Sequence, residues 1–452
     1  MKMRKIMAVL VLLIVTVPVA LGTALDDYVA APDSNYSYKV LKTIEVPGCT
    51  GYVLEMTSQS WRSEKEVDRT VWKHWLTIIK PEKVASDIAL LWITGGSNDR
   101  PAPERPEQML VAIAQNSGSV VAEIKMVPNQ PLNFPDGGRP RDEDGIIAYT
   151  FDKYIKTGDA TWPLLLPMVK SAVRAMDTIQ SHIASATEGK LKINKFVVSG
   201  GSKRGWTTWL TAAVDKRIIA IAPAVIDVLN MAEQMKHHYA AYGFYSKAIE
   251  DYQDMNIFAR LDTPEGKALQ KFIDPYAYRD RYTMPKYLIN SSGDQFFLCD
   301  SAQFYFGDLP GEKYLRYVPN TDHGLGGSDA DKSLLVFYAS ILKNLPRPKF
   351  TWTIQSDRII VKPQTGTLQQ VNLWQATNPK ARDFRLQTIG AVWNASPLPQ
   401  DNDGTYVAKV AKPEEGWTAF FVEMIYDSGL PFPYKFTTQV QVVPDTLPFA
   451  KN

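Results

Sequence analysis

Cysteine and histidine are scarce in this chain of 452 residues, which holds two of the first and five of the second. Two thiols cannot build a metal cage or a disulfide-dense scaffold. Cys49 and Cys299 can form one disulfide in an oxidising compartment or remain two buried thiols, and the sequence leaves both open. The chain also lacks a glycine-rich dinucleotide fingerprint. We therefore expect neither a metal nor another cofactor.

An excess of charge of either sign is also missing. The chain has 50 basic and 48 acidic side chains, which give a formal net charge of +2. A nucleic-acid partner favours a clearly basic surface, whereas Lys and Arg are scattered here. The charge balance therefore argues against a nucleic-acid partner. A hydrophobic content of 45% with 22% charged residues is typical of a globular protein, and the length favours two domains.

Long apolar runs are absent beyond the N-terminus, where one covers residues 6–21. Lys2, Arg4 and Lys5 precede it, and small residues end it. A basic start, an apolar middle and a small-residue end are the parts of a secretory signal peptide. We predict a signal peptide over residues 1–24 and a secreted, periplasmic or extracellular location. No stable membrane span is expected after its removal.

Short strand-like runs alternate with longer helical stretches between residues 25 and 345. The expected strands are rich in Val, Ile, Leu and Tyr, and they cover 88–94, 120–125, 195–199, 218–226, 287–291 and 314–318. Helical patterns lie between them, at 107–115, 162–183 and 206–213. This alternation predicts an α/β fold, resembling an α/β-hydrolase, in which a mostly parallel sheet carries helices on both faces.

Two segments depart from this alternation. Residues 228–282 hold several aromatic residues among charged ones at helical spacing, which predicts a helical insertion between two strands of the sheet. Its aromatic residues are expected to pack, and a cap over a pocket is the alternative. Residues 346–452 contain short alternating strands, the last over 436–443, broken by Pro, Asn, Asp and Gly. They predict a small all-β sandwich domain.

The strongest local signal for chemistry is KFVVSGGSKRGW, residues 195–206. An apolar strand runs into Gly200, Ser202 and Gly205 and then into a helix. A nucleophile elbow requires this order, because its tight turn leaves room only for small neighbours and exposes the serine hydroxyl. The match to G-x-S-x-G is irregular, since Arg204 stands where the final glycine belongs. An N-capping serine in a glycine-rich turn is the alternative.

A serine hydroxyl needs a nearby base, usually histidine. His323 lies on a loop just after the last expected strand of the α/β part, where an α/β-hydrolase carries its base. The other histidines fall on an early strand (His74), at a helix end (His182) and on the first helix of the insertion (His237 and His238). We expect a solvated face for the last two.

The acid of such a site is expected between serine and histidine, on a loop after a strand. Asp294 meets this description, and Gly293 allows the chain to bend there. Its role would be to fix the histidine tautomer and to stabilise the imidazolium. Asp227, which closes the strand 218–226, is the alternative acid.

Backbone N–H groups that stabilise an oxyanion are expected after an early strand and directly after the serine. The strand 88–94 ends in paired glycines, so the N–H of Gly96 is one candidate donor. The N–H of Lys203 is the second, since this residue follows Ser202.

With these residues in view, the chain resembles the PhoPQ-activated pathogenicity-related protein family. The resemblance is carried by long segments between positions 72 and 323, among them GGSKRGWTTW (200–209), APAVIDVLN (222–230), DPYAYRDR (274–281) and GDQFF (293–297). It implies an exported α/β-hydrolase-like protein and supplies no substrate. The serine followed by a basic residue is also similar to glucuronoyl esterases, whose motif reads G-C-S-R-x-G. That similarity implies that the Lys203 side chain assists the oxyanion or holds an acidic substrate.

Two functions from different classes follow. The first is an exported serine hydrolase that cleaves an ester or an amide, in a small molecule or a peptide, through Ser202, His323 and Asp294. The second is a secreted binding or signalling protein that keeps the α/β-hydrolase scaffold without the reaction.

Overall fold

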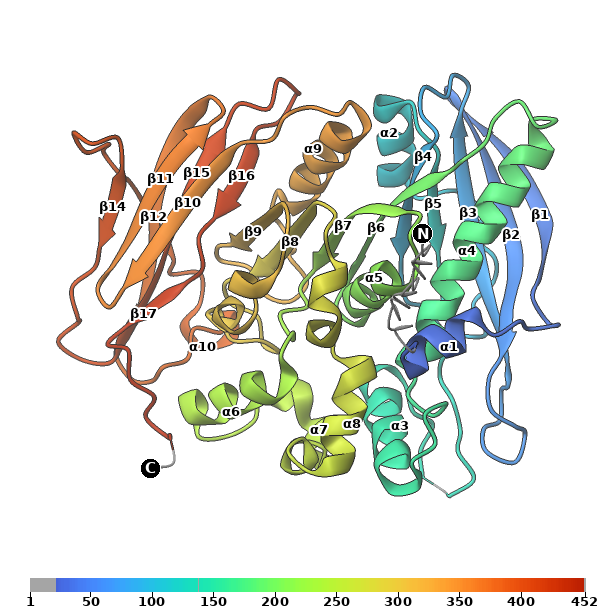
Figure 1. Ribbon diagram of the computed structural model, residues 1–452, viewed down its shortest axis with the longest axis horizontal. Coiled ribbons are helices and arrows are strands. Elements are labelled where there is room, and N and C mark those ends of the chain that lie inside the picture. The colour runs from blue at the N-terminus through green and yellow to red at the C-terminus, as the bar shows by residue number, and fades with distance from the viewer. Residues whose placement is uncertain (1–21, 137, 451–452) are drawn as a thin grey trace, which may run out of the picture.

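The computed structural model describes residues 22–136 and 138–450, so all but the end of the predicted signal peptide lies outside the described residues. Within them, one large sheet has the strand order β1-β2-β3-β5-β4-β6-β7-β8-β9 (Figure 1). Its strands are β1 (Ser37–Val46), β2 (Cys49–Ser60), β3 (Val71–Pro81), β4 (Ile88–Ile93), β5 (Val121–Ile124), β6 (Lys195–Gly201), β7 (Ile218–Ala224), β8 (Lys286–Ser291) and β9 (Lys313–Val318).

The sheet is mostly parallel, as the sequence predicted. Strands β4 to β9 pair in parallel, and each lies within a few residues of its expected position. Strands β1 to β3 pair antiparallel, and of these only β3, the early strand of His74, was expected. They are joined by turns rather than by crossover helices, and β1 carries more exposed residues than a central strand does.

Helices cover both faces of the sheet. Helices α1 (Ala24–Ala30), α4 (Leu165–Ala186) and α5 (Lys203–Val214) pack on one face, and α2 (Gln108–Ser117) and α9 (Ala330–Leu342) pack on the other. Strand β6 shows why, because Phe196 and Val198 join the core of the first face while Val197 joins that of the second. Both cores are therefore built from strands that are apolar on both sides. No helix among the described residues is long and apolar enough to cross a membrane.

The helical insertion lies between β7 and β8, beside α3 (Glu143–Thr157) at the bottom of Figure 1. It contains α6 (Met231–Tyr242), α7 (Glu250–Asp254), α8 (Pro264–Ile273) and short 3-10 turns. Two hydrogen bonds fasten it to α3: the Tyr252 hydroxyl donates to Asp144 and Arg260 donates to Asp152, each at 2.8 Å.

The C-terminal residues form two antiparallel sheets, drawn orange to red in Figure 1. The first contains β10 (Lys349–Gln355), β11 (Arg358–Thr365) and β14 (Tyr406–Lys409). The second contains β13 (Asn394–Pro397), β12 (Leu368–Asn378), β15 (Trp417–Tyr426) and β16 (Tyr434–Thr437), with β17 (Gln441–Val443) also paired to β15. Residues of β11, β12 and β15 share one buried core, as in a sandwich.

The single strand expected over 436–443 is wrong, because this segment forms parts of β16 and β17, which pair with different stretches of β15. At the break, the Thr438 hydroxyl takes the place of a backbone carbonyl and accepts the N–H of Val422 at 3.1 Å.

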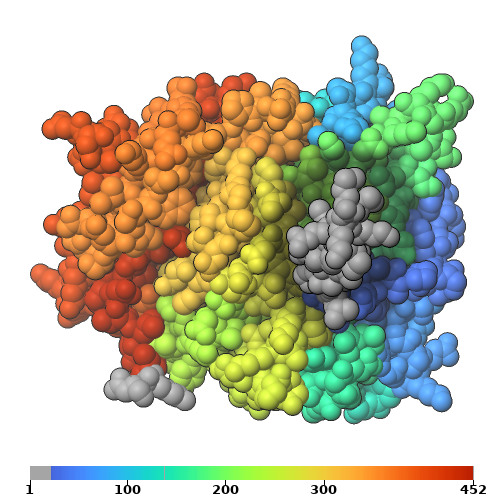
Figure 2. All heavy atoms as spheres, in the orientation of Figure 1, coloured from blue at the N-terminus to red at the C-terminus, as the bar shows by residue number. Residues whose placement is uncertain are grey.

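The C-terminal sheets pack directly against the edge of the large sheet (Figure 2). Here the backbone N–H of Tyr317 on β9 donates to the Thr437 hydroxyl on β16 at 3.0 Å. The Tyr287 hydroxyl on β8 donates to the carbonyl of Lys435. Cys49 and Cys299 are both buried and free, so no disulfide joins them.

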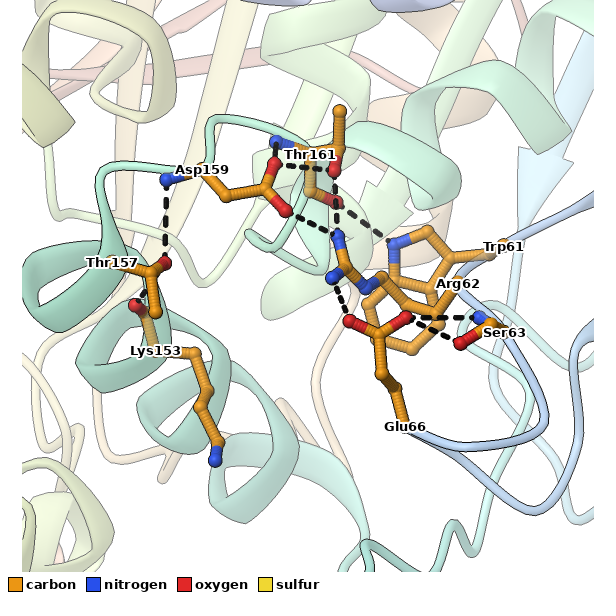
Figure 3. A network of polar contacts seen from close by, with 8 residues as sticks. All are labelled: Trp61, Arg62, Ser63, Glu66, Lys153, Thr157, Asp159 and Thr161. Carbon is orange, nitrogen blue, oxygen red and sulfur yellow. Dashed lines mark hydrogen bonds and ion pairs between the residues drawn. The ribbon is translucent and has the colours of Figure 1, made fainter.

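A polar network connects the residues that follow β2 with the turn between α3 and α4 (Figure 3). Arg62 donates to Asp159 at 2.8 Å and to the Thr161 hydroxyl at 2.6 Å, and it also pairs with Glu66. The Trp61 indole N–H donates to the Thr161 carbonyl at 3.1 Å. This network fixes the start of α4, whose long apolar face covers the sheet.

Candidate active site

Ser202 sits at the turn between β6 and α5, with a backbone φ of 58° and ψ of −131°. This positive φ is strained for a residue with a Cβ and is typical of functional turns. Ser202 occupies the N-cap position, but its side chain makes no capping hydrogen bond to the helix. The N-capping alternative is therefore wrong. The backbone N–H of Ser202 donates to the carbonyl of Ala224 on β7 at 2.9 Å, which holds the turn in place.

The glycines around Ser202 explain the irregular motif. A Cβ on Gly200 would lie 2.9 Å from the carbonyl oxygen of Arg204. A Cβ on Gly205 would lie 2.7 Å from Ile226 and 3.0 Å from the carbonyl oxygens of Ala224 and Gly200. The close approach of strand and helix thus falls at Gly205, one position later than in G-x-S-x-G. The turn keeps its geometry although the spacing differs.

His323 and Asp294 form a hydrogen-bonded pair. Nδ1 of His323 lies 2.8 Å from Oδ2 and 3.0 Å from Oδ1 of the buried Asp294. The backbone N–H of His323 donates to the Gln295 side chain at 3.1 Å, and the Phe296 ring lies against the imidazole with centroids 4.2 Å apart. Nε2 of His323 is buried and has no hydrogen-bond partner among the described residues. The imidazole is thus fixed on one side and available on the other.

Ser202 and His323 line the same cleft, which has a volume of about 490 Å³. Ser202 also lines a second cavity of about 40 Å³ beneath the helical insertion. A larger hollow of about 1130 Å³, between residues 306–314 and the start of β10, shares no lining residue with either. The structure therefore brings Asp294, His323 and Ser202 to one edge of the sheet.

Asp227, the alternative acid, has other partners. Its two carboxylate oxygens accept hydrogen bonds from the hydroxyls of Tyr305 and Tyr317, each at 2.5 Å. Burial raises the pKa of Asp227 to about 7, although the two hydroxyls act in the opposite direction. No hydrogen bond joins Asp227 to His323 among the described contacts, so Asp294 holds the position that orients the imidazole.

Gly96 and Lys203 follow the ends of two neighbouring strands, β4 and β6. Gly96 follows β4, whose Ile93 pairs with Gly200 of β6, and its φ of 138° is open to glycine alone. Lys203 is the first residue of α5, where backbone N–H groups have no partner within the helix. Both expected donors thus lie at the same edge as Ser202.

The side chain of Lys203 is engaged elsewhere. Its ammonium is buried and pairs with Glu143 at 2.6 Å and with Asp144 at 3.2 Å. These two carboxylates already neutralise it, which argues against the substrate-binding role implied by glucuronoyl esterases.

Arg204 explains why a bulky residue stands where a glycine is usual. Its guanidinium reaches across Gly95 and binds Glu143 through two nitrogens, at 2.7 and 2.8 Å. Its Nε also donates to the carbonyl of Val127 at 2.6 Å. Burial alone would raise the pKa of Glu143, but hydrogen bonds from Arg204 and the charges of Lys203 and Arg204 lower it to about 2. Sequence reasoning missed Glu143, and two adjacent basic residues after the serine were its only signal.

The histidines of the insertion correct another expectation. His237 and His238 are buried rather than solvated. Nε2 of His237 lies 3.0 Å from Asp300, which also binds Arg382 at 2.6 Å. Burial alone would raise the pKa of Asp300, but Arg382 and the hydrogen-bonded His237 hold it well below its usual range. Nε2 of His238 accepts the backbone N–H of Ser246 at 3.0 Å, and burial lowers the pKa of His238 to about 3.

Comparison with known proteins gives the family. The profile of the PhoPQ-activated pathogenicity-related proteins matches residues 25–385. The chain belongs to this family. It is also 40% identical, over 97% of its length and 94% of the relative, to autocrine proliferation repressor protein A of Dictyostelium discoideum.

Solved structures of esterases are similar to this chain at low sequence identity. An acetyl xylan esterase from Paenibacillus sp. R4 is 13% identical with a TM-score of 0.49, covering 71% of this chain and 91% of that one. Acetyl xylan esterase 1 from Thermoanaerobacterium sp. JW/SL YS485 is 15% identical with a TM-score of 0.46, covering 69% and 89%. A glucuronoyl esterase from Solibacter usitatus is 13% identical with a TM-score of 0.40, covering 70% and 90%.

The family match extends beyond the large sheet to Arg385, and the residues that follow this point contact the loops of the candidate site. The backbone N–H of Leu386 donates to the carbonyl of Gly293 at 2.9 Å, next to Asp294. Asn320, on the loop of His323, exchanges two 2.9 Å hydrogen bonds with the backbone of Trp393. Residues 382–393 therefore hold both loops of the His323–Asp294 pair.

Proposed function

We propose that this protein is an exported serine hydrolase that cleaves an ester or an amide. One observation carries the proposal. His323 is bound to Asp294 through Nδ1. Its Nε2 is buried beside a cleft that Ser202 lines and has no hydrogen-bond partner within residues 22–136 and 138–450. An imidazole held in this way has one nitrogen ready to accept a proton.

In the proposed reaction, the Ser202 hydroxyl attacks the substrate carbonyl carbon while Nε2 of His323 takes its proton. The resulting imidazolium is stabilised by the Asp294 carboxylate, which keeps Nδ1 protonated throughout. His323 then gives the proton to the leaving alcohol or amine, and the acyl group remains on Ser202. A water molecule, activated by the same nitrogen, releases the acid and restores the serine.

The negative oxygen of each tetrahedral intermediate needs donors that are in place beforehand. We assign this role to the backbone N–H groups of Gly96 and Lys203. The start of α5 adds the positive end of the helix dipole at the same point. The Arg204–Glu143 pair supports this assignment, since it ties the first turn of α5 to α3 and to the loop that follows β5.

Labelling with a fluorophosphonate probe tests the proposal on the purified protein. We expect covalent labelling between pH 6 and 9 that is abolished by Ser202→Ala. Ser328→Ala is the matched control, because Ser328 lines the same cleft and its hydroxyl is bound to the carbonyl of Leu325. Absence of labelling in the wild type across this range, or equal labelling in Ser202→Ala, would refute the hydrolase.

A second candidate function is a secreted signalling protein that uses the fold without the reaction. The observation in its favour is the 40% identical relative, which is named autocrine proliferation repressor protein A. Purified protein added to cultures of the producing cells would then change their growth, and Ser202→Ala would act equally well. Loss of the effect in a correctly folded Ser202→Ala protein would instead link it to catalysis.

The location is part of the proposal. We infer export with removal of residues 1–24, from the basic, apolar and small-residue order of the N-terminus. Sequencing of the mature N-terminus from the medium or the cell envelope is expected to begin near Leu25. Intact protein starting at Met1 would contradict this inference.

A further inference from the structure

Two cavities of very different size meet at Ser202. The cleft that includes His323 measures about 490 Å³, within the range of pockets that hold a drug-sized ligand. The cavity beneath the insertion measures about 40 Å³. Ser202 is the one residue common to both linings. A molecule attacked by this serine therefore has one part on each side of it.

The small cavity has apolar walls. Met231, Met235, Ile257 and Phe258 of the insertion line it, and Phe296 closes it on the side of His323. These side chains offer a bound group dispersion contacts and no hydrogen bonds.

Two charged residues also reach the small cavity, and they are paired with each other. The Lys203 ammonium lies 3.2 Å from Asp144, and the same carboxyl group accepts the Tyr252 hydroxyl at 2.8 Å. A second ion pair, to Glu143, completes the neutralisation of Lys203. A group bound here therefore meets an apolar wall in which the charges of Lys203 and Asp144 are already paired.

The position of His323 decides which part of the substrate enters which cavity. As general acid, Nε2 must give its proton to the leaving group, so the leaving group lies on the side of His323. His323 lines the large cleft and not the small cavity. The acyl part, which stays on Ser202, accordingly faces the small cavity.

We propose that the substrate joins a short, unbranched acyl group to a bulky alcohol or amine. This inference rests on the proposed hydrolase function and adds the substrate class. The small cavity has less than a tenth of the volume of the large cleft, about 40 against about 490 Å³, so it admits a much smaller group. An acetyl or propionyl chain fits that space, whereas a medium-length chain collides with Met235 and Ile257.

The experiment compares p-nitrophenyl acetate, butyrate and octanoate, which differ only in the acyl chain. We expect kcat/KM for the acetate to exceed that for the octanoate by at least about 100-fold, since each misfitted methylene costs roughly tenfold or more. Met235→Ala removes atoms from the wall of the small cavity and is expected to narrow this ratio at least tenfold. Ile257→Val, a smaller change in the same wall, serves if Met235→Ala does not fold.

Met109→Ala is the matched control, because Met109 lines the large cleft and is 41% exposed. It should leave the acetate-to-octanoate ratio unchanged. Equal rates on all three esters, or faster cleavage of the octanoate, with intact probe labelling of Ser202 would overturn the acyl assignment and leave the hydrolase standing. Absence of probe labelling would remove the hydrolase itself, so the two failures are distinguishable.

Discussion

Replacement of Gly205 by alanine tests whether the turn at Ser202 is built as described. An alanine in a helix is favoured over glycine by about 1 kcal/mol, so the substitution would stabilise the protein if space were available. The added Cβ would instead lie 2.7 Å from Ile226 and 3.0 Å from two carbonyl oxygens, those of Ala224 and Gly200. The isoleucine side chain can adjust, but the carbonyls belong to β7 and β6 and move only with the sheet.

Overpacking of this kind costs about 1–3 kcal/mol. After the gain of about 1 kcal/mol in helix propensity, we expect a net loss of up to about 2 kcal/mol in the free energy of unfolding. The shift of α5 away from β6 also displaces Ser202, so fluorophosphonate labelling should slow by tenfold or more. Both effects are measurable by urea denaturation and by the labelling rate of the same sample.

Gly201 provides the internal control. A Cβ at this position would meet nothing nearer than Val225 at 3.8 Å, an ordinary contact. Gly201→Ala should therefore retain wild-type stability or gain a few tenths of a kcal/mol. A Gly205→Ala protein that is as stable and as reactive as the wild type, or a Gly201→Ala protein that is the weaker of the two, would refute the packing argument.

Four further outcomes are expected. Asp294→Asn should lower kcat by about 10³–10⁴-fold through loss of the correct imidazole tautomer, and Asp227→Asn should not; the reverse result would exchange their roles. The pKa of Asp227 is raised to about 7, so its contribution to the free energy of unfolding is lost as pH rises from about 4 through 7. The melting temperature of the wild type should therefore fall over this pH range, and that of Asp227→Asn should not show this fall. His74 gives the opposite pH dependence, because burial lowers its pKa to about 4. The free energy of unfolding should fall by up to about 3 kcal/mol as pH decreases from 6.5 to 4, and His74→Asn should remove this decrease. Arg382→Met leaves Asp300 buried with one cationic partner fewer and should cost about 3–5 kcal/mol, part of which Asp300→Asn restores; an unchanged urea midpoint would contradict this.

The parallel core of the fold was predictable because its strands are apolar on both faces. Strands such as β6 and β8 appear in the sequence as short continuous apolar runs, and these were located to within about two residues. Strand β1 has one solvated face and an irregular pattern of exposure, so it gives no such run. Strand β1 was missed for this reason.

The residues of the site that follow strand ends in a typical order along the chain were predictable. The residues that are placed by pairing with distant parts of the chain were not. Ser202, Asp294 and His323 follow strand ends in the order typical of the fold, and parallel strands bring such ends to one edge. The pairing of Arg204 with Glu143, 61 residues apart, leaves no periodic signal. His237 was expected on a solvated face for the same reason, because its partner Asp300 lies 63 residues away in the sequence.

The docking of residues 382–393 makes the two parts of the chain interdependent. A chain shortened at residue 345 would lose the backbone donor that holds the Gly293 carbonyl and would leave Asp300 without its arginine. Its large sheet would still have every strand, yet the loops of Asp294 and His323 would lack their support. Exchange of C-terminal halves between relatives should thus succeed only where the surfaces at Gly293, Asp300 and Asn320 match, so the two halves are expected to evolve as one unit.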